Sequence, residues 1–277
     1  MIPPLNLIGA GHVGRTLGRL FAARGVFDVQ DVVTRSAAGA QEAVAFIGAG
    51  RPLADVAAMR PATVWMLAVA DDAIGAVAGR LAQSAPLAGA VVFHCSGAKA
   101  SGELAALRRA GAHVASVHPV RSFADPETVA AAFDGTFCGV EGDEAALATL
   151  LPAFEAIGAR PVRIDAAAKT VYHAAAVFAS NYLVTVMDAA LRAYQAAGIP
   201  ADVARALARP LATETLANVL RLGPEAALSG PIARGDAATV ARQHDAVTAW
   251  DPATGTLYDA LATATWDLAR RKRASSN

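Results

Sequence analysis

The stretch Leu5–Gly14, Leu-Asn-Leu-Ile-Gly-Ala-Gly-His-Val-Gly, decides the fold. Four mostly apolar residues predict a short strand, the glycines that follow are spaced G-x-G-x-x-G, and residues 15–21 have the pattern of a helix. A strand, a glycine-rich turn and a helix in this order are typical of the start of a dinucleotide-binding unit. Gly9 would allow the tight turn, Gly11 the close approach of a pyrophosphate, and Gly14 the packing of helix on strand. A tight turn without a ligand is the alternative interpretation.

The rest of the chain predicts an α/β domain followed by helices. Up to about residue 165, strand patterns alternate with helical patterns, which is typical of a doubly wound sheet. Thr63–Val69 is the clearest strand, because a near-continuous apolar run is expected where both faces of a sheet are covered. From Ala166 onward the pattern is helical, beginning with one long helix to Ala197. We therefore predict a Rossmann-type NADP-binding domain over residues 1–165 and an all-α substrate and dimerisation domain over residues 166–277.

The composition limits the classes of function. Of 277 residues, 55% are hydrophobic and 17% are charged, so the chain can bury a sizeable core. Lys plus Arg and Asp plus Glu are equal at 24 each, which argues against nucleic acid or an anionic membrane as the main partner. The two cysteines suggest no disulfide framework and fit a reducing cytoplasm. Val171–Met187 lacks charge but contains several polar residues, so we interpret it as a buried helix rather than a membrane span.

The residues at the end of the second predicted strand select the cofactor. That strand, Val29–Thr34, ends in Thr34-Arg35-Ser36, one cation between two hydroxyls. An NAD-binding domain usually has an acidic residue here for the ribose 2′-OH, and Asp31 lies too early in the strand to serve. A guanidinium and two neutral donors suit a phosphate, so the sequence favours NADP over NAD. An exposed loop arginine is the alternative.

Further cofactor contacts are expected where other strands end at the same edge of the sheet. Small residues at those ends would let the nicotinamide ribose approach, although ordinary loops have a similar composition. The residues predicted to contact the cofactor are Gly9, Ala10, Gly11, His12, Val13, Gly14, Thr34, Arg35, Ser36, Val69, Ala70, Asp71, Cys95, Ser96 and Gly97. The sequence predicts no metal site.

Several motifs together resemble a bacterial family whose members have a Rossmann-like N-terminal domain and a helical C-terminal domain of unknown function. The motifs are Gly9–Gly18, Leu67–Asp72, His94–Ala98, His118-Pro119 and Lys169–Ala175. The family lies within a broader group that contains pyrroline-5-carboxylate reductases, deazaflavin-dependent NADP oxidoreductases, 6-phosphogluconate and β-hydroxyacid dehydrogenases and ketopantoate reductases. The resemblance covers essentially the whole chain, and it implies an NADP-linked oxidoreductase without fixing the substrate.

Two details of the resemblance concern the reaction centre. The β-hydroxyacid dehydrogenases place a catalytic lysine four residues before an asparagine on the interdomain helix. Here the fourth residue after Lys169 is His173, so this chain departs from that pattern and the lysine's role does not carry over directly. The dipeptide His118-Pro119 is similar to the His-Pro of prephenate dehydrogenases.

A polar stripe on the first long helix is a candidate reaction centre. Ideal helix spacing of about 100° per residue puts His173 about 40° and Ser180 about 20° from Lys169, with Asn181 at the stripe's edge. Such a stripe on an apolar helix is expected to face a polar cleft. Lys169 or His173 could donate the proton that hydride addition needs, with Asn181 orienting the substrate. The alternative is a lysine that snorkels at the helix start and a satisfied core histidine.

Two further positions complete the predicted site. His118 ends a third strand at the ligand edge and is the remaining candidate for the proton donor. Arg234, within Gly230–Asp236, is expected to bind a substrate carboxylate, with Ser180 also contacting the substrate. The alternative is a turn between helices in which Asp236 is a helix cap and Arg234 is solvated.

These observations predict a cytoplasmic, NADP-dependent oxidoreductase that transfers a hydride between NADP(H) and a small carbonyl or imine, such as a 2-oxo or β-hydroxy acid. Among enzymes, a ketopantoate-type reductase competes with an imine reductase. The rival from another class is a non-catalytic NADP-binding protein whose helical domain docks a partner. The helical half is rich in Ala, Leu and Val, so we also expect a homodimer formed through that domain.

Overall fold

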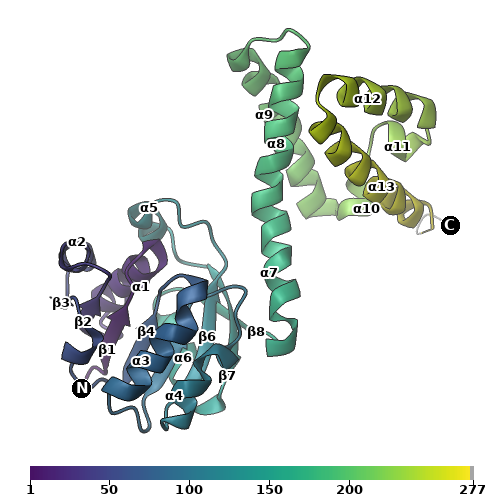
Figure 1. Ribbon diagram of the computed structural model, residues 1–277. Helices are drawn as coiled ribbons and strands as arrows, with labels where there is room; N and C mark the ends of the chain where they lie inside the picture. The colour runs from purple at the N-terminus through teal and green to yellow at the C-terminus, as the bar shows by residue number, and fades with distance from the viewer. Residues whose placement is uncertain (275–277) are drawn as a thin grey trace. The chain divides into compact units, whose positions relative to one another are not determined.

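The computed structural model describes residues 1–274, and the chain divides into two compact units, the first ending at Val177 and the second beginning at Phe178 (Figure 1). The first unit is a sheet with helices packed on it, and the second is built of helices alone within the described residues. The predicted fold class, a Rossmann-type sheet followed by helices, is confirmed. The functional boundary at residue 165 stays a prediction.

Eight strands form one sheet in the order β3-β2-β1-β4-β5-β6-β7-β8. Neighbouring strands are parallel, except that β7 runs antiparallel to β6. The strands are β1 Pro4–Ile8, β2 Asp28–Val33, β3 Arg51–Leu53, β4 Val64–Leu67, β5 Val91–His94, β6 His113–Pro119, β7 Phe137–Gly142 and β8 Arg160–Arg163. The strand order reverses direction between β1 and β4, which is where ligands of such sheets bind.

Helices cover both faces of the sheet. The helices of the first unit are α1 His12–Ala23, α2 Ala37–Ile47, α3 Ile74–Ser84, α4 Ala105–Arg109, α5 Pro126–Ala131, α6 Glu144–Ala156 and α7 Lys169–Val177. Side chains of α1, α2 and α6 form one core cluster with the sheet, and side chains of α3 and α4 form the other. Successive strand residues supply opposite clusters: Leu7 packs into the first and Ile8 into the second. All four residues of β4 are therefore buried, as its apolar run predicts.

The second unit begins with a break in helix regularity. Residues Phe178–Tyr182 form a π-helix between α7 and α8, within the stretch predicted as one long helix. The remaining helices are α8 Leu183–Ala196, α9 Ala201–Leu222, α10 Pro224–Ala227, α11 Pro231–Arg234, α12 Ala237–Trp250 and α13 Pro252–Ala274. The predicted N-cap of α12 is confirmed, because the Asp236 side chain accepts a hydrogen bond from the Thr239 N–H at 3.0 Å.

The helical run Ala166–Ala196 is long and apolar enough to cross a membrane, by length and composition alone. Within the chain it is not a buried helix, so that prediction was wrong: Val171, Phe178 and Val184 are 75%, 69% and 69% exposed. The first turns of this run are nevertheless fixed to the sheet, because Lys169 and Tyr172 bond to strand residues. Length and composition are therefore weak evidence for a membrane span here.

Candidate functional site

The glycine-rich turn has the geometry that its spacing predicts. Gly9 has φ +85°, and its N–H donates to the Val33 carbonyl at 2.8 Å, which ties the turn to the end of β2. A Cβ on Gly14 would lie 2.6 Å from the Gly9 carbonyl oxygen, so only glycine lets α1 pack this closely. A Cβ on Gly11 would meet nothing within 4 Å. The turn is thus closed at Gly9 and Gly14 and open at Gly11, the N-cap of α1, and an open helix N-terminus of this kind suits an anion.

A pocket of about 430 Å³ lies beside this turn and is lined by Thr34 and Arg35 of the predicted cofactor trio, with Ser36 next to them in the chain. Gly9, Thr34 and Arg35 line it together with Val69, and the segment Ala54–Ala57 forms another part of its wall. The two hydroxyls of the trio differ. Thr34 donates its hydrogen to the Ser36 carbonyl at 2.8 Å, whereas the Ser36 hydroxyl accepts from the Gly39 N–H at 3.1 Å and keeps its own hydrogen. Arg35 and Ser36 are therefore the stronger candidates for donors to a phosphate.

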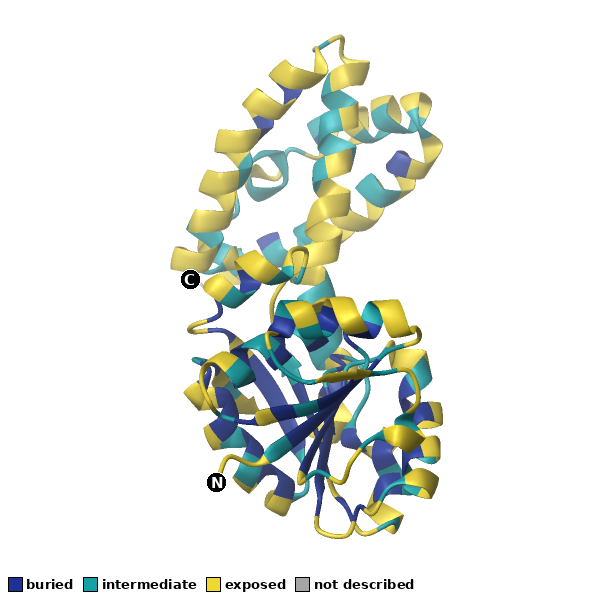
Figure 2. Cartoon of the chain, turned by 90° about the vertical axis from the view of Figure 1, so that its left-hand side faces the viewer, coloured by how far each residue is buried: buried dark blue, intermediate teal, exposed yellow. Residues whose placement is uncertain are grey.

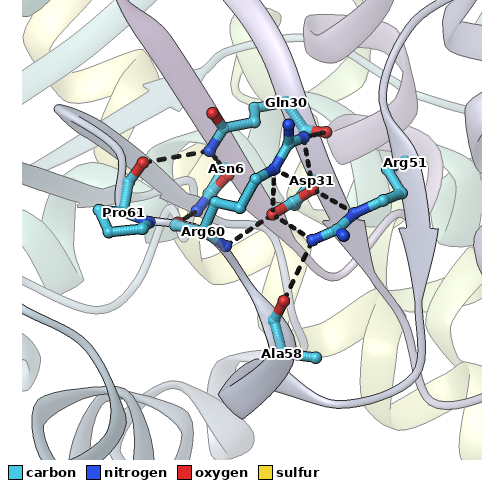
Figure 3. A network of polar contacts seen from close by, with 7 residues as sticks. All are labelled: Asn6, Gln30, Asp31, Arg51, Ala58, Arg60 and Pro61. Atoms are coloured by element: carbon cyan, nitrogen blue, oxygen red, sulfur yellow. Dashed lines mark hydrogen bonds and ion pairs between the residues drawn. The ribbon is translucent and has the colours of Figure 1, made fainter.

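The wall of this pocket is held by a buried carboxylate (Figure 3). Asp31 is fully buried in β2 and accepts hydrogen bonds from Arg51 at 3.0 Å and from Arg60 at 2.8 Å. Burial alone would raise the pKa of Asp31, but the hydrogen bonds from Arg60 and Arg51 outweigh it and lower that pKa. Arg51 also donates to the Ala58 carbonyl, and the Arg60 N–H donates to Asp31 at 2.7 Å. The residues directly after Ala54–Ala57 are thereby fixed to the sheet.

A turn after β5 brings two histidines together. The Ser96 hydroxyl accepts from the Lys99 N–H at 2.9 Å, which shapes the turn, and Gly97 is buried within it. A Cβ on Gly97 would lie 2.3 Å from Cδ2 of His173 and 2.7 Å from Nε2 of His118. The rings of these two half-buried histidines are 5.7 Å apart between centroids. Gly97 is thus the position over which both imidazoles pack, and a larger residue there would displace them.

His118 lies inside β6 rather than after it, as a correction to its predicted place, because the strand continues to Pro119. Its Nδ1 is 3.0 Å from the Tyr172 hydroxyl, and the two rings meet edge to face. Burial, with smaller effects from the charges of Lys169 and His173, lowers the pKa of His118 to about 4. His118 is therefore neutral at neutral pH.

Lys169 is buried instead of lining an open surface. Its side chain is 1% exposed, its Nζ donates to the Ser116 hydroxyl, and it lies 3.7 Å from the Glu141 carboxylate. Glu141 also accepts from the N–H and the hydroxyl of Ser101, both at 2.7 Å. Burial lowers the pKa of Lys169, and Glu141 partly offsets this. Lys169 is therefore enclosed by Ser116 and Glu141 and shielded from solvent, and it is not presented on an open surface.

The helical spacing that put Ser180 beside Lys169 does not hold. It assumes a regular α-helix, whereas Ser180 and Asn181 lie in the π-helix that follows α7, where each residue turns through a smaller angle. Both are exposed residues of the second unit, as is Arg234 at the end of α11. Their predicted substrate contacts stay predictions.

The other predicted cofactor residues follow the ends of β1, β4 and β5. Ala10 accepts a hydrogen bond from Arg15 through its carbonyl, and exposed His12 bonds the Phe123 carbonyl at 2.5 Å, while Val13 packs against the core. Val69 is half-buried, and exposed Ala70 and Asp71 begin the turn after β4. Half-buried Cys95 has a thiol whose pKa is raised by burial, so it stays protonated.

Sequence reasoning missed three parts of this site. Tyr172 is three residues after Lys169, so helical spacing could have placed it on the flank of the same stripe. Gly139, opposite His118 in the β6–β7 ladder, and Glu141 lie in β7, a strand for which the sequence predicted no role in the site. The pocket wall Ala54–Ala57 belongs to a segment without a clear pattern, and nothing in the sequence could have revealed it.

Comparison with protein families matches both parts of the chain. Residues 4–119 match the model of the Rossmann-like domain, and residues 136–265 match the model of a domain of unknown function, DUF2520. This pairing confirms the resemblance to a bacterial family with a Rossmann-like domain and a helical domain of unknown function. No curated protein sequence matches the chain.

Solved structures share the fold along nearly the whole chain. A candidate NADP oxidoreductase from Bacteroides fragilis is 23% identical with a TM-score of 0.78, covering 96% of this chain and 98% of that one. A protein from Thermotoga maritima is 27% identical with a TM-score of 0.76, covering 97% and 99%. A pyrroline-5-carboxylate reductase from Coxiella burnetii is 14% identical with a TM-score of 0.60, covering 98% and 99%. NAD(P)-linked oxidoreductases are thus among the proteins of similar fold.

Proposed function

We propose that this chain, which joins a Rossmann-like domain to a DUF2520 domain, is an NADP(H)-dependent oxidoreductase of a small carbonyl or imine compound. One observation carries the proposal. The glycine-rich turn, the pocket with Arg35 and the histidine pair on Gly97 all lie where strands β1, β2, β5 and β6 end. That edge is where sheets of this type bind dinucleotides, so a cofactor seated there would extend toward titratable side chains.

The choice of NADP rests on Arg35 in the pocket beside the turn and on Ser36, the next residue in the chain, whose hydroxyl hydrogen is not used by the Gly39 bond. A guanidinium and a hydroxyl hydrogen recognise a 2′-phosphate, and the one acidic residue near the end of β2, Asp31, is buried and bound by arginines. The Bacteroides fragilis protein of similar fold, described as a candidate NADP oxidoreductase, points the same way. The residues present therefore fit NADP, which would supply the hydride.

Arg35→Asp tests this choice by calorimetric titration with NADPH and NADH. The unmodified protein should bind NADPH more tightly, and the variant should lose that preference, because a repulsion replaces an ion pair. Arg109→Asp, a change of the same charge at an exposed site on α4 outside the pocket, is the matched control. Equal affinities of the unmodified protein for the two cofactors would contradict the proposal.

The reaction needs a hydrogen-bond or proton donor beside the atom that gains charge when the hydride adds. His118 and His173 fit this role better than buried Lys169, because both are only half-buried and both pack over Gly97. The Coxiella burnetii protein is named for a cyclic imine that carries a carboxylate, which makes cyclic imines and 2-oxo acids the first compounds to test. Oxidation of NADPH by one class in a screen would support the proposal. NADPH binding without turnover would favour the non-catalytic alternative.

A second copy of the chain is the partner that the helical unit suggests. Val203, Leu207 and Leu211 recur every four residues along α9, so they form one stripe, and they are 42%, 47% and 62% exposed. Two identical apolar stripes can cover each other about a two-fold axis. We therefore propose a homodimer formed through the helices of the second unit.

A further inference from the structure

The two ring nitrogens of His118 have different surroundings. Nδ1 is 3.0 Å from the Tyr172 hydroxyl. Nε2 has no hydrogen-bond partner among the described residues. Every buried side-chain nitrogen or oxygen of those residues has such a partner, so Nε2 is not a buried atom. It is therefore open to solvent or a ligand. Nε2 is also the atom that lies over the empty side-chain position of Gly97. One nitrogen is therefore held by the protein, and the other is presented.

The Tyr172 hydroxyl is fixed from the opposite side by the backbone. A Cβ on Gly139 would lie 2.4 Å from its oxygen, so the phenol packs directly on the Gly139 backbone. Among the described residues, Nδ1 of His118 is the hydrogen-bond partner of that hydroxyl. A phenol O–H donates and the unprotonated nitrogen of a neutral imidazole accepts, so the hydroxyl hydrogen is directed to Nδ1. A phenol that donates at Nδ1 leaves one arrangement for the imidazole.

We infer that Tyr172 is a positioning residue that holds His118 as the neutral tautomer with its hydrogen on Nε2, aimed past Gly97 at the substrate. The tautomer of a histidine is set by the hydrogen bond at its other nitrogen, and a donor at Nδ1 puts the ring hydrogen on Nε2. His118 then donates a hydrogen bond to the oxygen or nitrogen that becomes electron-rich as the hydride adds. This inference rests on the proposed function for its catalytic meaning, but the tautomer itself does not.

The β6–β7 ladder explains why Tyr172 can contact both groups at once. His118 and Gly139 are directly opposite each other in this antiparallel pair, so their distance is set by the sheet. Tyr172 projects from α7 onto this pair and bridges it. Burial keeps His118 neutral above about pH 4, which a defined tautomer requires, and burial also raises the pKa of Tyr172, so the phenol keeps its hydrogen. Lys169 and His173 act electrostatically to lower the pKa of His118, and Asp71 acts to raise it. Together these effects leave His118 neutral at pH 7.

Nitrogen NMR of ¹⁵N-histidine-labelled protein tests the tautomer without any substrate. His118→Ala identifies the signals of His118 among the six histidines. We expect the Nε2–H tautomer in the unmodified protein at pH 7 and a mixture of tautomers in Tyr172→Phe. Tyr258→Phe, which removes a hydroxyl that donates to Gln243 at 2.9 Å in the second unit, is the matched control and should leave His118 unchanged. An Nδ1–H tautomer in the unmodified protein, or an unchanged tautomer in Tyr172→Phe, would overturn the inference.

A double-mutant cycle then tests the catalytic meaning with a substrate from the screen. His118→Ala should lower turnover by about 100- to 10,000-fold, and Tyr172→Phe by about 10- to 100-fold, the usual effect of losing a group that orients a functional histidine. NADPH affinity should stay the same in both. Because Tyr172 acts through His118, the double variant should be no slower than His118→Ala alone. Additive losses would overturn the positioning role, whereas an Nε2–H tautomer in a protein without turnover would refute the proposed function alone.

Discussion

Each unit of the chain contains a charged side chain bound by two residues of opposite charge, and the two hubs differ in burial. In the first unit, Asp31 is fully buried between Arg51 and Arg60 (Figure 3). In the second, Arg192 is 44% exposed and binds Asp188 and Asp251, each at 2.9 Å. A buried charge must keep its partners, because water cannot replace them, whereas an exposed charge can be solvated. The same arrangement of charges is thus obligatory in one unit and optional in the other.

Apolar side chains show the same contrast. The central strands of the first unit, β1 and β4 to β7, are mostly buried, whereas the edge strands β3 and β8 are not. Most of the helical surface of the second unit is exposed (Figure 2). Among the described residues of the second unit, the buried positions are Ala204, Ala208, Val240, Thr254, Gly255 and Ala269. The first unit is therefore organised around its own core, and the second leaves an apolar surface for a partner. Substitutions in the first should affect folding most, and those in the second should affect assembly most.

The largest expected effect is on assembly. The joint change Leu207→Asp and Leu211→Asp puts two charges on the exposed stripe of α9, and it should convert a dimer into a monomer of 28.1 kDa while helix content is kept. Light scattering at micromolar concentration and circular dichroism measure the two properties. Val162→Asp, at an apolar residue of similar exposure in the first unit, is the control and should leave the dimer intact. If the unmodified protein is itself a monomer, the proposed homodimer is wrong.

The next effect is on stability. Asp31→Asn removes the charge that Arg51 and Arg60 share, and we expect the free energy of unfolding to fall by about 2–4 kcal/mol, because charge-assisted bonds at a buried site are lost. Asp251→Asn at the exposed hub should cost clearly less, since Arg192 keeps Asp188 and water. Urea unfolding at pH 7 compares the two variants. Equal losses of unfolding free energy in the two variants would show that burial does not make the charges around Asp31 more important for stability than those around Arg192.

Acid should distinguish the same two variants from the unmodified protein. The pKa of Asp31 is lowered by its arginines, and that of Asp251 is lowered to about 2 by its bonds to Thr254 and Arg192. A carboxyl whose folded pKa lies below its unfolded value of about 4 contributes stability above pH 4, and this is lost as the pH falls through the folded pKa. As the pH is lowered from 5 to 2, the urea concentration at the unfolding midpoint should therefore fall less steeply for Asp31→Asn than for the unmodified protein. A parallel fall would contradict the sign of this pKa shift.

The smallest effect on the fold concerns the glycine-rich turn, where buried and open positions are three residues apart. Gly14→Ala puts a Cβ 2.6 Å from the Gly9 carbonyl and should lower the melting temperature by several degrees. Gly11→Ala has open space and should melt like the unmodified protein, yet bind NADPH at least tenfold more weakly, because the Cβ stands where a pyrophosphate would approach. Thermal melting and NADPH titration on both variants check this. Unchanged NADPH binding in Gly11→Ala would argue against the turn as the phosphate site.

The fold could be predicted from the sequence because its signals are local. The glycine spacing of Gly9–Gly14 and the apolar run of β4 each require one conformation, and both formed as expected. The candidate site could be predicted only in part, because its contacts join residues far apart in the chain. Tyr172 meets His118 across 54 positions, and Glu141 lies beside Lys169 only because β7 reverses direction. The π-helix at Phe178–Tyr182 also escaped prediction, since its composition suits a regular helix equally well.

The reversal of β7 has a mechanical consequence for the histidine. β6 reaches the ligand edge at His118 and β7 leaves that edge at Gly139, and the two residues are one rung of the same antiparallel ladder. When a sheet twists or breathes, a rung moves as a unit, so the Gly139 backbone on which the Tyr172 phenol packs and the imidazole that receives its hydrogen move together. The distance between the Tyr172 hydroxyl and Nδ1 of His118 therefore changes little when the sheet moves as a whole.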